Sequence, residues 1–315
     1  MTERMTENKI VLIKRKTRLE ELVVRYNTVQ QAQFYIERLG ADFEDYREED
    51  ARYRQAVAEA ATQLETLGRL QLLDREQVPN YLFGPSDTVV VLGQDGLVAN
   101  TLKYVTGLPL IGVNPDPQRW DGILLPFTIG DLRHIVPDVL LGRRPLREVT
   151  LAKAELNDGQ CLYGVNDLFI GRKTHVSARY QLRLGQQSEQ QSSSGVIVST
   201  GMGSTGWLSS VWAGAAGIVS SVMQEPLPHA GIREQALSWD ADRLYFAVRE
   251  PFPSRNTSAE LVFGQIASGQ QLRITSQMPE HGVIFSDGIE SDFLEFNAGV
   301  EAVISVAEQK GLLAV

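Results

Sequence analysis

Short apolar runs alternate with helical repeats in the first part of the chain. Apolar runs at residues 9–15, 88–93 and 109–114 predict β-strands. Residues 17–39 and 97–105 carry apolar side chains at helical spacing between these runs. Strands that alternate with helices are typical of βαβ units on a parallel sheet. The pattern therefore predicts a Rossmann-like α/β domain.

Two further helices are predicted in the same region. The first helical segment has a natural end at Gly40. Residues 41–70 are charged and rich in alanine, which predicts a second, largely solvated helix. Residues 128–144 predict another helix.

After residue 144 the chain changes to short strands separated by turn residues. Runs such as "REVTLAKAEL", "VNDLFIGR", "ARYQLRL", "GVIVST", "RLYFAVRE", "QLRITSQ" and "VEAVISVAE" predict a sandwich or a stack of sheets. The serine- and glutamine-rich residues 185–195 are predicted to form a polar loop. We therefore expect an α/β domain at residues 1–135 and a β-rich domain at residues 136–285.

Composition narrows the class of protein. Hydrophobic residues make up 43% and charged residues 22% of the 315, as in an ordinary globular protein. The net charge of −9 argues against a nucleic-acid partner. Residues 207–223 are apolar but contain serines and are short for a membrane span, so a buried helix is expected. The polar start and the single Cys161 fit a cytoplasmic protein without a disulfide.

The motif "GQDG" follows a predicted buried strand and has two interpretations. Gly93 and Gly96 could let backbone N–H groups approach a phosphate, with the carboxylate of Asp95 exposed beside them. The same residues could form an Asx-type turn with Asp95 near a helix N-cap. Residue pattern alone favours the turn.

The motif "STGMGSTGW" at residues 199–207 contains glycines in G-x-G-x-x-G register. It matches a dinucleotide fingerprint formally, with Glu225 as a possible ribose ligand. In a dehydrogenase this loop would have to begin a helix that packs on a parallel sheet. Here the loop lies in the strand-rich half of the chain instead. Neither a Walker A loop nor a hydrolase elbow at Ser204 fits the spacing.

Two other sets of polar residues could form sites. Asn166 and Asp167 stand side by side at the head of a predicted strand, where a turn role is the default. The four histidines lack metal-ligand spacing, so no protein metal site is predicted.

The order of these motifs resembles that of the ATP-dependent NAD kinase family. "GQDG", "GVN", "NDLFIGR", "GVIVSTGMGSTGW" and "SDGIE" follow one another as G-G-D-G-T, G-I-N, N-E-V, S-T-P-T-G-S-T-A-Y and D-G-Q do in that family. The resemblance covers most of the chain from about residue 87 onward. It implies that residues 286–315 return to the first domain. It also implies transfer of the γ-phosphoryl group of ATP to the adenosine 2′-hydroxyl of NAD.

The resemblance also implies roles for individual residues. Asp95 would take the proton from the attacking hydroxyl, and Mg²⁺ would be held mainly by the phosphates. The residues that would bind the nucleotides are Gly93, Gly96, Asn166, Asp167, Thr205, Gly206 and Trp207. The expected partners are small nucleotides, with no nucleic acid or membrane, and the chain is expected to form a homo-oligomer.

Several positions depart from the family pattern. Gln94 replaces a glycine, so its backbone either avoids positive φ or bears a strain of about 1–2 kcal/mol. Leu97 replaces a threonine, Trp207 replaces a tyrosine, and Ser194 stands where the family has an aspartate before a glycine. A catalytically silent dinucleotide-binding protein and a kinase for another hydroxyl acceptor, such as a sugar or polyol, therefore remain alternatives.

Overall fold

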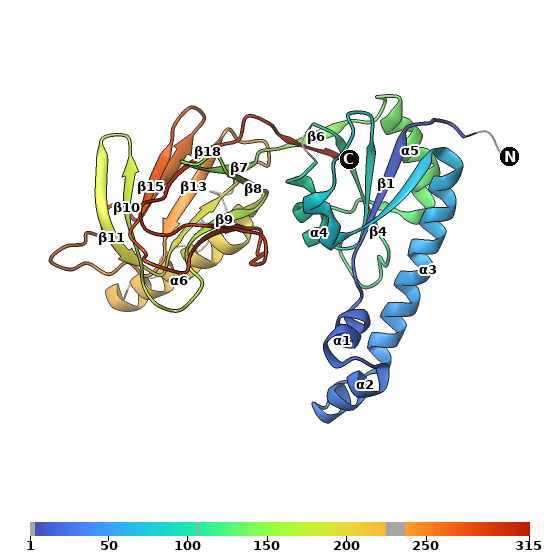
Figure 1. The fold of residues 1–315 in the computed structure, drawn as a ribbon, viewed down its shortest axis with the longest axis horizontal. Coiled ribbons are helices and arrows are strands. Elements are labelled where there is room, and N and C mark those ends of the chain that lie inside the picture. The colour runs from blue at the N-terminus through green and yellow to red at the C-terminus, as the bar shows by residue number, and fades with distance from the viewer. Residues whose placement is uncertain (1–3, 106, 225–236) are drawn as a thin grey trace. The chain divides into compact units, whose positions relative to one another are not determined.

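The protein divides into two compact units (Figure 1). Each unit has its own hydrophobic core. The computed structural model describes residues 4–105, 107–224 and 237–315. The first unit runs to Arg147 and includes Leu312–Val315, and the second spans Glu148–Gly311.

The first unit is built on a seven-stranded sheet in the order β2-β1-β3-β4-β19-β6, with β5 beside β4. The pairs β1–β2, β1–β3, β3–β4, β4–β5 and β4–β19 are parallel. The predicted Rossmann-like parallel sheet is confirmed. Its strands are β1 (Lys9–Lys14), β2 (Arg69–Asp74), β3 (Thr88–Leu92), β4 (Pro109–Asn114), β5 (Phe127–Thr128), β6 (Leu146–Val149) and β19 (Gly311–Ala314).

Helices of this unit pack on the sheet through apolar side chains. The core between α3, α5 and the central strands includes Leu12, Leu64, Val90, Ile111 and Leu132. The helices are α1 (Arg18–Tyr26), α2 (Val29–Arg38), α3 (Glu44–Leu67), α4 (Asp95–Leu102) and α5 (Leu132–Leu140), with short 3-10 helices η1 (Arg75–Asn80) and η2 (Ile129–Asp131).

Two helix predictions in this unit need correction. The helix predicted at residues 17–39 is two helices, because Asn27 is left-handed (φ 67°) and the side chain of Thr28 caps α2. The helix predicted at residues 41–70 forms as α3 and is largely solvated, with six of its 24 residues buried, among them Tyr53 and Ala60. Its predicted end at residue 70 also runs into β2.

The second unit consists of two six-stranded sheets, ordered β11-β10-β15-β18-β7-β8 and β14-β13-β12-β9-β16-β17. One core contains residues of both sheets, including Tyr180 and Ile274 from the first and Ile170 and Phe246 from the second. The predicted β-rich, sandwich-like unit is confirmed. Its strands are β7 (Ala152–Leu156), β8 (Cys161–Gly164), β9 (Asp167–Arg172), β10 (Ala178–Leu184), β11 (Gln187–Ser193), β12 (Val196–Ser199), β13 (Arg243–Val248), β14 (Phe263–Ala267), β15 (Leu272–Ser276), β16 (Gly282–Ser286), β17 (Phe293–Glu295) and β18 (Glu301–Val306).

The predicted polar loop at residues 185–195 is wrong, because most of it forms the edge strand β11. This strand pairs antiparallel with β10 along its whole length. The buried hydroxyl of Tyr180 bonds with Gln191 Oε1 at 3.2 Å and Ser193 Oγ at 2.7 Å. Polar side chains are tolerated in the strand because their hydrogen bonds are satisfied inside the unit.

The helix predicted at residues 207–223 is present, but its predicted burial is wrong. It forms α6 (Trp207–Met223) with the 3-10 helix η3 (Gly203–Thr205) before it, and only Leu208 of α6 is buried among the described residues. Ile218 and Val222 are 69% and 77% exposed. By length and composition, residues 203–223 could cross a membrane, a criterion that soluble helices also meet. The apolar composition predicted the helix, but it could not show how much of the helix surface would pack against the rest of the unit.

The unit boundary differs from the predicted one. Residue 135, the predicted end of the first domain, lies inside α5. Only the C-terminal strand β19 joins the first sheet, whereas β17 and β18 pair within the second unit. Strand pairing assigns residues 286–311 to the second unit. The sequence could not predict this, because it does not show which strands pair.

Candidate functional site

The "GQDG" motif connects β3 to α4 at the carboxyl end of a buried strand. β3 ends at Leu92, Gln94 is the N-cap, and Asp95 is the first residue of α4. Gln94 has φ −120° and ψ 163°, so it takes the unstrained alternative of extended backbone. A side chain at Gly96 would meet nothing within 4 Å, so packing does not require a glycine there.

The carboxylate of Asp95 is held by the backbone of the loop that follows β4. Its Oδ1 accepts a hydrogen bond from the N–H of Leu124 at 2.7 Å, and its Oδ2 accepts one from Ile123 at 3.3 Å. This loop packs so closely on β4 that a Cβ on Gly112 would lie 2.0 Å from the carbonyl oxygen of Leu124. Asp95 is therefore oriented from its own turn and from the neighbouring strand end.

A buried tyrosine joins this turn to the end of β1. The hydroxyl of Tyr53 on α3 donates to the carbonyl of Leu92 at 2.7 Å and accepts from the N–H of Arg15 at 3.0 Å. Leu92 directly precedes Gly93. The helix α3 therefore supports the motif through a single side chain.

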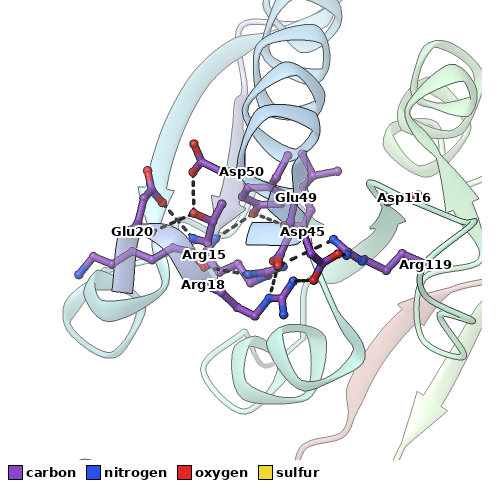
Figure 2. A network of polar contacts seen from close by, with 12 residues as sticks. Arg15, Arg18, Glu20, Asp45, Glu49, Asp50, Asp116 and Arg119 are labelled. Carbon is purple, nitrogen blue, oxygen red and sulfur yellow. Dashed lines mark hydrogen bonds and ion pairs between the residues drawn. The ribbon is translucent and has the colours of Figure 1, made fainter. Parts of the chain in front are cut away.

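Charged residues surround the end of β1 (Figure 2). Glu49 of α3, 5% exposed, pairs with Arg15 at 2.9 Å and with Arg18 at the start of α1. Asp45 pairs with Arg18 at 2.7 Å and with Arg119 of the loop after β4. Alternating arginines and carboxylates thus connect β1, α1, α3 and this loop.

In the second unit, one carboxylate organises the Asn166–Asp167 turn. Asp287 Oδ1 accepts hydrogen bonds from the N–H groups of Asn166 at 2.6 Å, Val165 at 3.1 Å and Asp167 at 3.3 Å. Asp287 itself has φ 54°, a left-handed conformation that aspartate tolerates better than most residues. The "SDGIE" motif pointed to this position, but the sequence did not identify Asp287 as the organiser of the turn.

Asp167 lies in a setting that disfavours its charged form. Its Oδ1 is buried and has no hydrogen-bond partner. Burial, and to a smaller extent the nearby carboxylate of Asp287, raises the pKa of Asp167 to about 7. Its protonation state therefore changes near neutral pH.

The loop at residues 199–207 packs directly against this turn. A Cβ on Gly203 would lie 2.0 Å from the carbonyl oxygen of Asn166, so only glycine fits there. Thr200 Oγ1 donates to the carbonyl of Val165 at 2.5 Å. Thr205 and Gly206 are exposed, and Trp207 stacks on Phe169 with ring centroids 5.8 Å apart.

The dehydrogenase alternative is excluded by the sheet that carries this loop. β12, which precedes the loop, pairs antiparallel with β9 and β13. The dinucleotide fingerprint needs a parallel βαβ unit. Close packing explains two of the glycines in the loop. Gly203 packs against the carbonyl of Asn166, and a Cβ on Gly201 would lie 1.9 Å from the carbonyl oxygen of Ser238. Glu225 lies outside the described residues.

Beside Trp207 the second unit contains a pocket of about 640 Å³. Its walls combine aromatic and cationic side chains, which the sequence did not single out. The lining residues are Phe169, Arg172, Lys173, Thr174, His175, Val176, Ser194, Trp207, Arg249, Val283, Phe285 and Glu290.

The structure thus gathers the predicted residues into two groups. Gly93, Asp95 and Gly96 lie together in the first unit. The others, Asn166, Asp167, Thr205, Gly206 and Trp207, lie on adjoining segments of the second. Within residues 4–105, 107–224 and 237–315, no three His, Cys, Asp or Glu side chains form a metal-binding group.

Comparison with known proteins identifies the fold. No family model matches the chain. An NAD kinase from Archaeoglobus fulgidus, solved in complex with ATP, superposes with a TM-score of 0.56 at 15% identity, over 98% of this chain and 93% of that one. Yeast NADH kinase, solved with NADH, gives a TM-score of 0.56 at 14% identity, over 98% and 84%. The chain has the NAD kinase fold.

Two curated proteins are similar in sequence. A probable NADH kinase of Oryza sativa subsp. japonica is 24% identical over 226 residues, which is 64% of this chain. An NAD kinase of Paraburkholderia phytofirmans is 30% identical over 135 residues, 39% of this chain. The matches span 63% and 42% of these relatives' own lengths. The resemblance to the NAD kinase family is confirmed.

The raised pKa of Asp167 predicts a pH-dependent stability difference. As pH rises from about 4 to 7, the unfolded chain loses this proton while the folded protein retains it, so folding is penalised progressively. Asp167→Asn removes the penalty. The variant should therefore gain stability relative to the parent protein across this window, by roughly 1 kcal/mol per pH unit.

Urea denaturation of both proteins at pH 4.5 and pH 8 measures this difference. Glu260→Gln is the control, because Glu260 is an exposed carboxylate of the same unit. A difference for Asp167→Asn that is the same at both pH values would contradict the prediction.

Proposed function

We propose that the protein is a phosphotransferase of the NAD kinase type, which transfers the γ-phosphoryl group of ATP to the adenosine 2′-hydroxyl of NAD or NADH. One observation carries the proposal: in a chain with the NAD kinase fold, Asp95 begins a helix at the carboxyl end of a central parallel strand. Ligands of open α/β sheets bind at this end of the strands.

The chemistry requires a proton acceptor and a site for phosphate. Two backbone N–H groups hold the Asp95 carboxylate in one orientation, and each oxygen retains a lone pair that can accept the hydroxyl proton. The N-terminus of α4 and the uncrowded Gly96 offer backbone N–H groups to an anion. Proton removal and phosphate binding would thus take place on one turn.

The second unit would position the dinucleotide. Asn166 and Asp167 present an amide and a carboxyl group, and the exposed Thr205 and Gly206 lie on the segment packed against them. Hydrogen-bonding groups of this kind suit the edge of a purine. Mg²⁺ would be held mainly by phosphate oxygens and would offset charge during transfer.

A product assay tests the proposal. Purified protein is incubated with Mg²⁺, ATP and, separately, NAD, NADH or a panel of polyols, and products are identified by mass spectrometry. We expect a 2′-phosphorylated dinucleotide. Phosphorylation of a polyol alone would show a different acceptor, and binding of NADH without any product would show a catalytically silent binder.

We also propose that the chain forms a homo-oligomer through α6. The first turns of this helix pack on the second unit around Leu208 and Trp212. Ile218, Val222 and Met223, further along, are 64–77% exposed in a helix that has no charged residue over its 17 positions. A second copy that covered these side chains would remove this apolar surface from water.

Charged residues on this surface should separate the copies. Ile218→Glu with Val222→Glu should lower the molar mass measured by light scattering to that of the 34.9 kDa monomer. Ser210→Glu, on the exposed surface near the start of the same helix, is the control. If the parent protein is already monomeric, self-association through α6 is contradicted. If that monomer binds lipid vesicles, the apolar surface of α6 contacts a membrane instead. The cytoplasmic location stays a prediction.

A further inference from the structure

The helix α3 contacts both of the elements that orient the carboxylate of Asp95. One element is the "GQDG" turn itself, which α3 reaches through the hydroxyl of Tyr53. The other is the loop after β4, whose N–H groups at Ile123 and Leu124 bond to the two carboxylate oxygens. The position of Asp95 therefore depends on a helix that does not carry it.

The hydroxyl of Tyr53 joins the carboxyl ends of two parallel strands. It donates to the carbonyl of Leu92, the last residue of β3, at 2.7 Å, and it accepts from the N–H of Arg15, just after β1, at 3.0 Å. Tyr53 is 5% exposed and Leu92 is fully buried. Burial raises the pKa of Tyr53 to about 12, so the hydroxyl keeps its proton and continues to donate at neutral pH.

This hydrogen bond ties the turn to a helix, whereas the next bonds along the turn tie it to the sheet and to α4. The N–H of Gly93 reaches the carbonyl of Val113 on β4 at 3.3 Å, a long distance for such a bond. The carbonyl of Gln94 accepts from the N–H groups of the first turn of α4. The bond from Tyr53 is shorter than that from Gly93 and comes from outside the sheet.

Ion pairs connect the same helix to the loop after β4 (Figure 2). Arg119 of this loop pairs with Asp45, and its Nη1 lies 4.0 Å from Glu49. Asp116, also in the loop, lies 3.5 Å from Arg52. None of these pairs uses the hydroxyl of Tyr53. Removing that hydroxyl should therefore loosen the turn while the loop stays attached to α3, which would displace Asp95 relative to its partners in the loop.

We propose that Tyr53 is a positioning residue for phosphoryl transfer: its hydroxyl fixes the "GQDG" turn against the end of β1 and thereby places the Asp95 carboxylate at the attacking hydroxyl. The inference rests on the proposed function and adds a buried residue that acts through Asp95. A small displacement of a catalytic group lowers the rate of the chemical step more than it lowers substrate binding.

Tyr53→Phe tests the role, because it removes the hydroxyl and keeps the ring, which lies 5.0 Å from the guanidinium of Arg15. We expect kcat for dinucleotide phosphorylation to fall about ten-fold. The KM values for ATP and for the dinucleotide should stay within about two-fold of the parent values, since the lost interaction serves the transition state.

Tyr180→Phe is the matched control in the second unit. Tyr180 is also a buried tyrosine, and its hydroxyl bonds with Gln191 and Ser193 inside the core. Both variants should melt at a lower temperature than the parent protein, because each leaves buried polar groups without a partner. Only Tyr53→Phe should lower kcat.

A double-mutant cycle with Asp95→Asn identifies the residue through which Tyr53 acts. In the Asp95→Asn background the carboxylate that Tyr53 positions is already absent, so Tyr53→Phe should cause no further fall in kcat. A second fall of the same size in this background would overturn the proposal, because the two residues would then act independently.

The remaining outcomes separate this proposal from the proposed function. A Tyr53→Phe protein with the parent kcat, or one that loses no more activity than Tyr180→Phe, would overturn the positioning role and leave the proposed function standing. A parent protein that phosphorylates no dinucleotide would overturn the proposed function and this inference together.

Discussion

Replacing Asp95 with asparagine should lower kcat for dinucleotide phosphorylation by about 10²–10⁴-fold, the usual range for a positioned proton acceptor. Asparagine keeps the size of the side chain, and its amide oxygen can still accept one N–H from the loop at residues 123–124. It cannot accept the hydroxyl proton. The KM for the dinucleotide should change little, because the proton transfer belongs to the transition state.

The two hydrogen bonds of Asp95 to the loop require a control for structure. Losing one of them should cost about 1 kcal/mol of stability, which thermal melting can detect separately from kcat. Asp121→Asn changes an exposed carboxylate on the same loop and should alter neither kcat nor stability. An Asp95→Asn protein with the parent kcat would show that Asp95 only anchors the loop.

Replacing Glu49 with glutamine should destabilise the first unit by about 3 kcal/mol, as expected when one partner of a buried ion pair is removed. Glu49 is 5% exposed, and the side chain of its partner Arg15 is 13% exposed. Glutamine keeps the shape of the side chain but leaves the guanidinium without its counter-charge. The loss should be seen as an earlier transition in urea denaturation followed by circular dichroism.

Glu48→Gln is the matched control on the same helix. Glu48 is 55% exposed and pairs with Arg52 at 3.1 Å, one helical turn away. Such surface pairs contribute less than about 0.5 kcal/mol. If the two variants unfold at the same urea concentration, the network in Figure 2 does not contribute to stability in the way proposed.

The apolar pattern predicted most of the parallel sheet correctly. The runs at residues 9–15, 88–93 and 109–114 became β1, β3 and β4, whose side chains are almost all buried. Strands that are buried on both faces need continuous apolar sequence, and that signal is local. The strand β2 was missed because it is not a continuous buried apolar run: only Leu73 of its six residues is buried, and the strand follows directly after a long helix.

The predicted site was partly visible in the sequence. Asp95, Asn166 and Thr205 lie in motifs whose order resembles the NAD kinase family, and the fold agrees. Asp287 accepts its hydrogen bond from the N–H of Asn166 across 121 positions of the chain. A contact at this separation cannot be recognised from any local motif. Tyr53 was missed for the same reason, because its partners Arg15 and Leu92 lie 38 and 39 positions away in the sequence.

The sequence by itself determined three central strands and the helical character of the segments between them in the first unit, the β-rich character of the second, and the motifs that suggest phosphoryl transfer. Local spacing of apolar residues and turn chemistry carry this information. Only the tertiary structure decided that residues 187–193 form a strand, that α6 is exposed, and that cations gather beside Trp207. These features depend on which distant surfaces meet, because burial and electrostatic environment arise from packing and are not encoded in any one segment.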